Sequence, residues 1–274
     1  MVNTDSINSS NQSAIPDFIL LHDIENIIIE KLPLPEFPQE IKKLLEKASQ
    51  QWLSEHKGAY DGLMFFPLKV NKDVAKKEFT ISGHYHEHGY ALHSILRDNL
   101  EQASEIRGAF RKLGIEYDAG LAVSAMLMSE VGVVLFKSNT TAYAHDKVWQ
   151  LPGGNIQDKD PLTTAIEEVR EEMGLPSTIT RNALQPFLYI WGGSNKKETA
   201  SFKYNPTLVY LMSIGSDIID KYIEPPDDDS ELSLDRATKY GVFSVSDIEK
   251  LFEGNGEEFT PGVALVLKTM LNTL

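Results

Sequence analysis

The chain has 274 residues, of which 42% are hydrophobic and 24% are charged, and its formal net charge is −14. This composition is ordinary for a globular protein with one or two domains. The negative charge argues against binding to nucleic acid and against a polybasic membrane patch, because both require clustered Lys and Arg. The absence of cysteine excludes disulfides, thiolate metal sites and cysteine nucleophiles.

The chain shows no sign of a membrane or secretory destination. No apolar run approaches the roughly 18 residues of a membrane-spanning helix. Residues 1–13 have neither the basic start nor the apolar stretch of a secretory signal. We therefore expect a cytoplasmic protein. Residues 1–15, rich in Asn and Ser, are typical of a disordered polar tail.

Residues 16–118 predict an N-terminal α+β region with its own core. A short strand is expected at 27–29, followed by a helix with one apolar stripe. That stripe consists of Ile41, Leu44, Leu45, Ala48 and Trp52. Further strands are expected at 62–70 and 79–85, and a helix at 90–100. Residues 101–118 predict one more helix and a linker.

A histidine-rich run, residues 84–88, stands out within this region. On a strand, His84, His86 and His88 would face one side and form an imidazole site for Zn²⁺. Gly83 and Gly89 bracket the run, so a loop without metal is equally compatible with it. A third interpretation places these histidines on the border of a substrate cleft between the two halves of the chain.

After residue 119 the pattern changes to strands with terminal helices. Residues 121–128 and 131–137 predict a hairpin that turns around Ser129 and Glu130. Strands are also expected at 187–191, 207–214 and 240–245. The segment 224–231 is too polar and proline-rich for a strand. A helix is expected to begin at Ser246, and the last helix at 263–271.

The most informative segment is 151–175, whose sequence predicts a glycine turn, a loop and a short acidic helix. Asp160 is a good N-cap, Pro161 suits the first helical position, and Gly174 ends the helix. The buried stripe is expected to contain Leu162, Ala165, Ile166, Val169 and Met173.

Three glutamates share another face of this helix. Glu168, Glu171 and Glu172 stand at i, i+3 and i+4, at the negative end of the helix dipole. Their mutual repulsion would be removed by divalent cations, and carboxylate oxygens suit Mg²⁺ or Mn²⁺. The alternative is a solvated face of an ordinary amphipathic helix.

With the preceding Trp149-Gln-Leu-Pro-Gly-Gly, this segment resembles the signature box of the Nudix hydrolases, G-x5-E-x7-R-E-U-x-E-E-x-G-U, where U is aliphatic. The pattern's glycine, glutamate and apolar positions are occupied by Gly154, Glu168, Val169, Glu171, Glu172, Gly174 and Leu175. The box departs from the pattern in three ways. Asp160 replaces the first glutamate, the segment before the helix is one residue short, and Glu167 occupies the arginine position.

The resemblance implies an α/β fold: an α-β-α sandwich with a mixed sheet at 119–274, preceded by the smaller α+β region. It also implies metal-dependent hydrolysis of the pyrophosphate linkage in a nucleoside diphosphate derivative, such as a nucleotide sugar or ADP-ribose. Glu168, Glu171 and Glu172 would be the catalytic metal ligands, with the Gly153 carbonyl completing the shell. Because Glu167 replaces the arginine that orients these glutamates in the family, the alternative is a catalytically silent module that binds a nucleotide or a protein partner.

Three further residues are candidates for contact with a small-molecule nucleotide substrate. Trp191 ends a strand beside two glycines and could stack on a base or sugar, or pack within the protein. Lys137 could contact a phosphate or remain solvated. Arg170 could pair with Glu167 in place of the lost arginine, or point into solvent. An additional carboxylate could come from Asp229, Glu231 or Asp235. The oligomeric state is open, a homodimer included.

Overall fold

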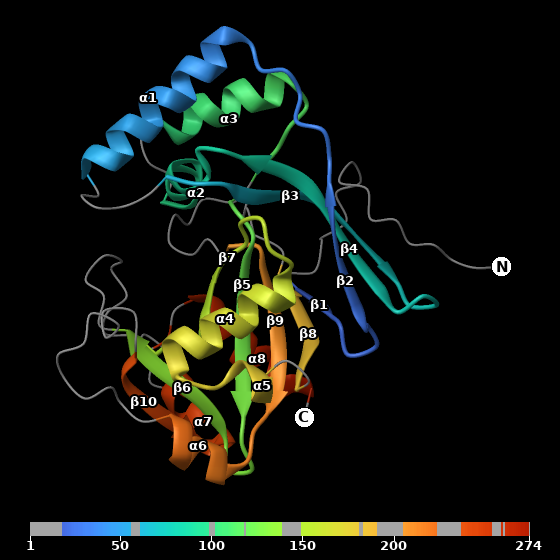
Figure 1. Ribbon diagram of the computed structural model, residues 1–274, viewed down its shortest axis with the longest axis vertical. Helices are drawn as coiled ribbons and strands as arrows, with labels where there is room; N and C mark the ends of the chain where they lie inside the picture. The colour runs from blue at the N-terminus through green and yellow to red at the C-terminus, as the bar shows by residue number, and fades with distance from the viewer. Residues whose placement is uncertain are drawn as a thin grey trace. The chain divides into compact units, whose positions relative to one another are not determined.

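The computed structural model shows helices and strands divided between two compact units (Figure 1). The described residues are 18–55, 61–98, 102–117, 119–138, 149–180, 183–190, 205–223, 237–253, 259 and 261–273. The first unit comprises the described parts of Met1–Ala122, Asn155–Asp160 and Tyr189–Leu208. The second comprises those of Val123–Gly154, Pro161–Leu188 and Val209–Leu274.

The N-terminal part of the chain forms a small sheet and three helices, as its periodicity predicts. The elements are β1 (Phe18–Leu20), β2 (Asn26–Lys31), α1 (Gln39–Glu55), β3 (Met64–Asp73), β4 (Glu78–His86), α2 (Gly89–Asp98) and α3 (Ala103–Lys112). The three-stranded sheet has the order β2-β4-β3, with β2 parallel and β3 antiparallel to β4. Among the described residues of this region, β1 is the one element that the sequence did not predict.

The apolar stripe of α1 explains how the helices of the first unit pack. Its buried members recur at helical spacing, while Leu44 is half-buried at the edge of the stripe. The stripe shares one core with residues of α2, α3 and β3. This core includes Ile41, Leu45, Ala48, Met64, Phe66, Leu92, Ile95, Leu96, Ile106 and Phe110.

Two histidines of the run lie inside this core. His84 and His86 on β4 are 5% and 4% exposed, and both hydrogen-bond the hydroxyl of Tyr117. Phe37 stacks on the His86 ring at a centroid distance of 5.7 Å. His88 follows β4 and lies 3.3 Å from Asp61, measured from Nδ1 to Oδ2. His84 and His86 therefore pack in the core, and no described group of three His, Asp or Glu side chains is placed to hold a metal.

This network favours uncharged histidines. A hydroxyl donates one hydrogen bond and accepts others, so Tyr117 can satisfy two neutral imidazoles at once. Burial lowers the pKa of His84. Burial, followed by the neighbouring His84 and His88, lowers the pKa of His86 from 6.5 to about 3. Burial also raises the pKa of the Tyr117 hydroxyl. The network is thus neutral over the whole physiological range.

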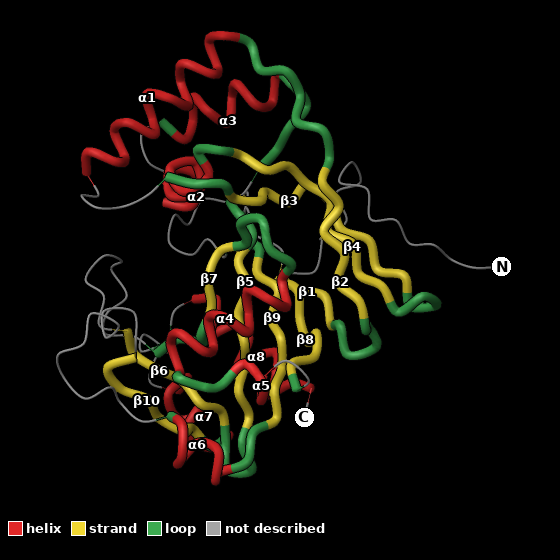
Figure 2. The backbone as a smooth tube through the Cα atoms, in the orientation of Figure 1, coloured by secondary structure: helices red, strands yellow, loops and turns green. Residues whose placement is uncertain are grey.

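The six remaining described strands join β1 in a seven-stranded sheet with helices, the mixed α/β architecture expected from the sequence. These strands and helices are β5 (Ala122–Met128), β6 (Val133–Ser138), β7 (Gly153–Asn155), α4 (Pro161–Met173), α5 (Ser177–Thr180), β8 (Leu184–Ile190), β9 (Thr207–Ser213), α6 (Ser216–Tyr222), β10 (Ala237–Phe243), α7 (Val245–Glu253) and α8 (Pro261–Thr273). The order is β1-β8-β9-β5-β6-β10, with β7 paired to β5. In the view of Figure 2, α4 lies in front of these strands and α8 behind them.

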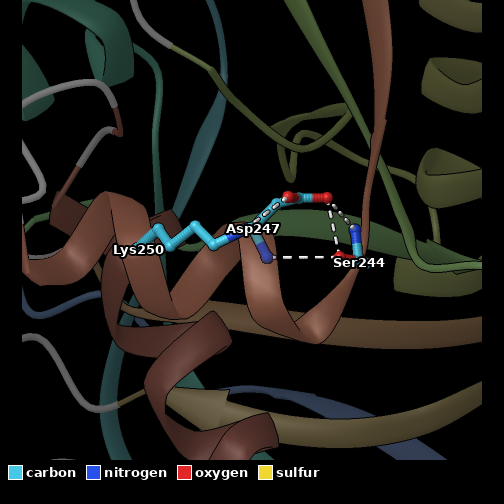
Figure 3. Close-up of polar contacts among 3 residues, drawn as sticks. All are labelled: Ser244, Asp247 and Lys250. Carbon is cyan, nitrogen blue, oxygen red and sulfur yellow. Dashed lines mark hydrogen bonds and ion pairs between the residues drawn. The ribbon is translucent and has the colours of Figure 1, made fainter.

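The predicted hairpin is present, and several predicted boundaries shift by one to three residues. Strands β5 and β6 pair antiparallel, with Leu127 opposite Val134. The predicted strand at 240–245 ends at Phe243, because Ser244 caps α7. The Asp247 amide donates to Ser244 Oγ at 3.2 Å, and the Ser244 amide donates back to Asp247 Oδ2 at 3.2 Å (Figure 3). This reciprocal capping box starts the helix one residue earlier than expected. In the described part of the chain, no helix has the length and apolarity needed to cross a membrane.

The neutral histidine network predicts acid sensitivity of the first unit. The folded pKa of His86 lies below its unfolded value of 6.5, so the unfolded state binds more protons below that pH. The contribution of neutral His86 to the free energy of unfolding is therefore fully present above pH 6.5. It falls as the pH drops toward 3, by roughly 1 kcal/mol per pH unit. Urea titrations at several pH values, read by hydrogen exchange of the β4 peptide, would measure the slope. His86→Leu should flatten it, and an unchanged slope would contradict the account.

Candidate functional site

The glycine turn before the acidic helix is pressed against strand β5. The amide of Ala125 donates to the Pro152 carbonyl at 2.8 Å, and β7 pairs with β5. A Cβ added at Gly153 would lie 2.3 Å from the carbonyl oxygen of Val123. Only glycine allows this approach of two backbones. The glycine expected to make a tight turn is thus also required for strand pairing.

Helix α4 follows with the expected start and end. Pro161 is its first residue, and Gly174, at φ +74°, ends it in the left-handed conformation. The buried face contains Pro161, Thr164, Ala165, Ile166, Val169 and Met173. Leu162, predicted to lie in this stripe, is only half-buried in the first turn, and Thr164 is buried instead. The glutamates are therefore on the face that is not packed into the core.

Two of the three predicted metal ligands meet the glycine turn. The Gly153 amide donates to Glu172 Oε2 at 2.8 Å. A Cβ added at Gly154 would lie 2.0 Å from Glu168 Oε1, so that carboxylate lies directly against the backbone of the turn. Both glutamates are half-buried. The structure thus brings Gly153, Glu168 and Glu172 together, and it adds Gly154 as the residue that makes room for Glu168.

Glu171 has a different partner. Its Oε1 lies 2.7 Å from Arg170 Nη2, and the two side chains are 54% and 52% exposed. Arg170 therefore pairs with the adjacent glutamate, whereas the sequence suggested Glu167 as its partner. An exposed pair of this kind contributes little to stability. Glu171 is accordingly free to exchange Arg170 for another positively charged group.

The donor chemistry of these residues fits a hard divalent cation. Glu168 and Glu172 bring two carboxylates to one turn, and the neighbouring Glu171 offers a third on the exposed side of the helix. Oxygen donors of this kind are preferred by Mg²⁺ and Mn²⁺. Among the described residues, however, the three carboxylates do not converge on one point as a preformed metal shell. Glu171 would have to leave Arg170 to join the other two.

The loop between the turn and the helix is held by residues of the first unit. The Phe65 amide donates to the Ile156 carbonyl at 3.1 Å, and the Ile156 amide donates to the Leu121 carbonyl at 2.9 Å. Gln157 Nε2 donates to the Tyr90 hydroxyl at 2.8 Å. The N-terminal region therefore anchors part of the signature segment. Sequence reasoning missed Phe65 and Tyr90, since backbone bonds and a lone tyrosine on a helix leave no recognisable pattern.

The charge of this loop also acts on Tyr85 of the same unit. Burial raises the pKa of Tyr85, and the carboxylate of Asp158 raises it further. Asp158 belongs to the loop that precedes α4, and Tyr85 belongs to β4. The loop thus lies close enough to β4 for its charge to act on a side chain there.

Of the other candidate residues, the described Lys137 contacts an aromatic ring. Lys137 on β6 lies over the Trp149 ring, with Nζ 4.6 Å from the ring centroid. Trp149 is 6% exposed and packs against Phe243 at 4.7 Å between centroids, which agrees with its expected packing role. Four further residues lie outside the described part of the chain: Trp191, Asp229, Glu231 and Asp235.

The two adjacent glycines should respond differently to alanine. Gly153→Ala drives a Cβ into backbone and should destabilise the fold by roughly 1–3 kcal/mol. Gly154→Ala meets only the end of the flexible Glu168 side chain, so it should change stability by less than about 1 kcal/mol while displacing that carboxylate. Thermal unfolding of both variants would measure the difference.

Gly108→Ala is the matched control, because its added Cβ meets nothing within 4 Å in α3. Removing a helical glycine should stabilise the protein by roughly 0.5–1 kcal/mol. Equal losses of stability for Gly153→Ala and Gly154→Ala would contradict the described geometry of the turn.

Comparison with known proteins identifies a family through a region that includes this segment. The family model described as NUDIX domain matches residues 118–259. Similar solved structures include a mutT/nudix family protein from Listeria innocua, with 16% identity, a TM-score of 0.37, and 56% of this chain and 92% of that chain covered. The NUDIX domain of Shewanella oneidensis NrtR, complexed with ADP ribose, has 14% identity, a TM-score of 0.38, and coverages of 56% and 88%.

A bifunctional NMN adenylyltransferase/ADP ribose pyrophosphatase from Francisella tularensis, complexed with AMP and a Mn ion, has 12% identity and a TM-score of 0.39. The match covers 68% of this chain and 52% of that one. The family model spans more than half of the chain and includes the glycine turn, the acidic helix and the strands around them. The chain belongs to the Nudix family.

Proposed function

We propose that the protein is a metal-dependent Nudix hydrolase that cleaves the pyrophosphate linkage of a nucleoside diphosphate derivative. The observation that carries this proposal is the attachment of two carboxylates to one glycine turn: Glu172 through the Gly153 amide and Glu168 against Gly154. The proposed ligands of Mg²⁺ or Mn²⁺ are Glu168, Glu171 and Glu172, with the Gly153 carbonyl as a further donor. Residues 119–274 form the proposed Nudix domain.

The electrostatics of the helix explain why a cation is needed. Glutamates at i, i+3 and i+4 repel one another, and the C-terminal end of a helix disfavours anions. The substrate adds the charge of two phosphates, which no carboxylate cluster tolerates nearby without a counter-charge. When bound, a divalent cation neutralises the phosphates and lowers the pKa of a coordinated water.

The residues of the chain then have defined tasks in the hydrolysis. A water oxygen forms a bond to one phosphorus, the bridging P–O bond breaks, and its electron pair stays with the departing phosphate. The proton released by the water goes to a general base, either one of the glutamates or a downstream acid. Glu172 is oriented by its bond to the Gly153 amide, and Glu168 by its contact with Gly154. Such fixed geometry lowers the cost of assembling the site.

The substrate class follows from charge and from the family. A net charge of −14 disfavours nucleic acid, so a small nucleotide such as a nucleotide sugar or ADP-ribose is preferred. Arg170 and Lys137 are the proposed phosphate contacts, and Trp191 the proposed base or sugar contact. Lys137 already lies over an aromatic ring at 4.6 Å, so a phosphate would have to draw it away from Trp149.

A silent binding module is the second candidate function, and two observations favour it. Glu167 stands where the family has an arginine, and the nearby Arg170 is engaged with Glu171. A module of this kind would bind a nucleotide and leave its pyrophosphate intact. The two functions differ in turnover, which makes them separable by one assay.

Hydrolysis should be metal-dependent and should require Glu172. A phosphatase-coupled screen would cover ADP-ribose, nucleotide sugars, dinucleotides, coenzyme A and nucleoside triphosphates, each with Mg²⁺, Mn²⁺ or EDTA. Glu172→Gln should lower kcat/KM by more than the roughly 10–100-fold that loss of an outer-shell group costs in metal sites. Glu167→Gln on the same helix is the matched control, because Glu167 is not a proposed ligand.

Three outcomes of this screen are informative. Release that disappears with EDTA and in Glu172→Gln supports the enzyme and identifies its substrate class. Nucleotide binding without release, together with release after Glu167→Arg, supports the silent module. Equal activity of wild type, Glu172→Gln and Glu167→Gln would overturn the proposed ligand set.

A further inference from the structure

Strand β2 forms an outer edge of the three-stranded sheet. Its neighbour is β4, to which it runs parallel, and no other described strand pairs with it. The Asn26 amide donates to the Lys77 carbonyl at 3.0 Å, and the Leu32 amide donates to the Gly83 carbonyl at 2.8 Å. Just before the strand, the Glu25 amide also donates to the Lys77 carbonyl, at 2.9 Å. Because a parallel ladder uses every second residue, the even-numbered residues of β2 bond to β4. The amides and carbonyls of Ile27, Ile29 and Lys31 therefore point outward.

The outward edge is apolar at its centre and charged at its ends. Ile28 is 39% exposed, and Ile27 and Ile29 are half-buried. Three consecutive β-branched residues have a high preference for strand pairing. Glu25 precedes the strand and Lys31 ends it, and both are exposed. An edge of this kind is a template for another strand unless charges oppose the pairing.

The charges at the two ends of this edge are complementary to those of a second copy that runs antiparallel to it. If two copies pair antiparallel about Ile28, then Ile27 lies opposite Ile29, and Glu25 lies opposite Lys31 at both ends. Ile27 and Ile29 are both outward-facing residues, so they form the hydrogen-bonded pairs, and Ile28 meets its own copy in a non-hydrogen-bonded pair. The backbone phase allows antiparallel registers that centre on Ile27, Ile28 or Ile29, and the charge pattern favours the one about Ile28.

The registers that centre on Ile27 or Ile29 lack the pairing of Glu25 with Lys31. A shift that centres the pair on Ile27 places Glu25 opposite Ile29, and a shift that centres it on Ile29 places Lys31 opposite Ile27. The first also places Lys31 opposite Asp23, which precedes the strand and already pairs with Lys72, and the second places Glu25 opposite Pro33. Cross-strand pairs of opposite charge stabilise a sheet, so the register about Ile28 is the favoured one.

We propose that two copies of this chain associate through β2, pairing antiparallel about Ile28 into a continuous six-stranded sheet. The occupant of the edge is a second copy because the edge is complementary to itself in both charge and hydrogen-bond phase. Within one chain, Glu25 already pairs with Lys77, and Lys31 lies over the Tyr85 ring at 5.7 Å. These contacts hold the two charged side chains at the ends of the strand in the monomer.

A charge-swap experiment tests both the dimer and its register. Sedimentation velocity over a concentration series would give the dimer dissociation constant of the full chain. Glu25→Lys and Lys31→Glu should each raise it roughly tenfold or more, because two cross-strand pairs become repulsive. A mixture of the two variants should form heterodimers again, since every pair in the mixed dimer joins Lys to Glu. Ile28→Lys should dissociate the dimer on its own.

Two controls separate pairing from folding. Lys76→Glu makes the same charge change as Lys31→Glu at an exposed position in the β3–β4 turn, and Val74→Lys matches Ile28→Lys at a 56% exposed valine. Both should leave the dissociation constant unchanged, and circular dichroism should match wild type for every variant. A wild-type chain that is monomeric throughout the series would overturn the proposal. So would a dimer unaffected by Ile28→Lys, or single variants that do not recover on mixing.

Discussion

The contact between the acidic end of α4 and the glycine turn is the constraint on which the candidate site depends. Two side chains that would repel each other in water are brought to one piece of backbone, Glu172 by the Gly153 amide at 2.8 Å and Glu168 by the space at Gly154. A backbone amide is a strong partner for a carboxylate because one group of the bond is charged. The turn thus offsets part of the repulsion and holds two donors for a cation.

The turn is itself fixed by backbone contacts. Strand β5 holds it through the bond from Ala125 to Pro152, and Gly153 permits the close approach. Within the first unit, the loop residues Ile156 and Gln157 are bonded to Phe65 and Tyr90. The N-terminal region therefore holds these two residues of the signature segment. This structural role of the N-terminal region does not depend on substrate specificity or on dimer formation.

Much of this arrangement could be predicted from the sequence, and the exceptions have physical reasons. Periodicity identifies α1 and α4, because a helix must bury one stripe, and the Pro161 and Gly174 signals bound α4 correctly. The glycine turn and the glutamates follow from the Nudix resemblance. Burial of His84 and His86 could not be predicted, because it depends on Tyr117, a partner distant in sequence. The engagement of Arg170 with Glu171 rather than Glu167 depends on rotamers, which spacing alone does not determine.

The central claim is that Glu168 and Glu172 together hold a divalent cation at the glycine turn. The most direct test is a titration of Mn²⁺ into the substrate-free protein, with free Mn²⁺ followed by electron paramagnetic resonance. Saturable binding is expected for the wild type, and weaker binding for both Glu168→Gln and Glu172→Gln with the fold retained. Binding of equal strength by all three proteins would contradict the central claim, because the cation would then be held elsewhere.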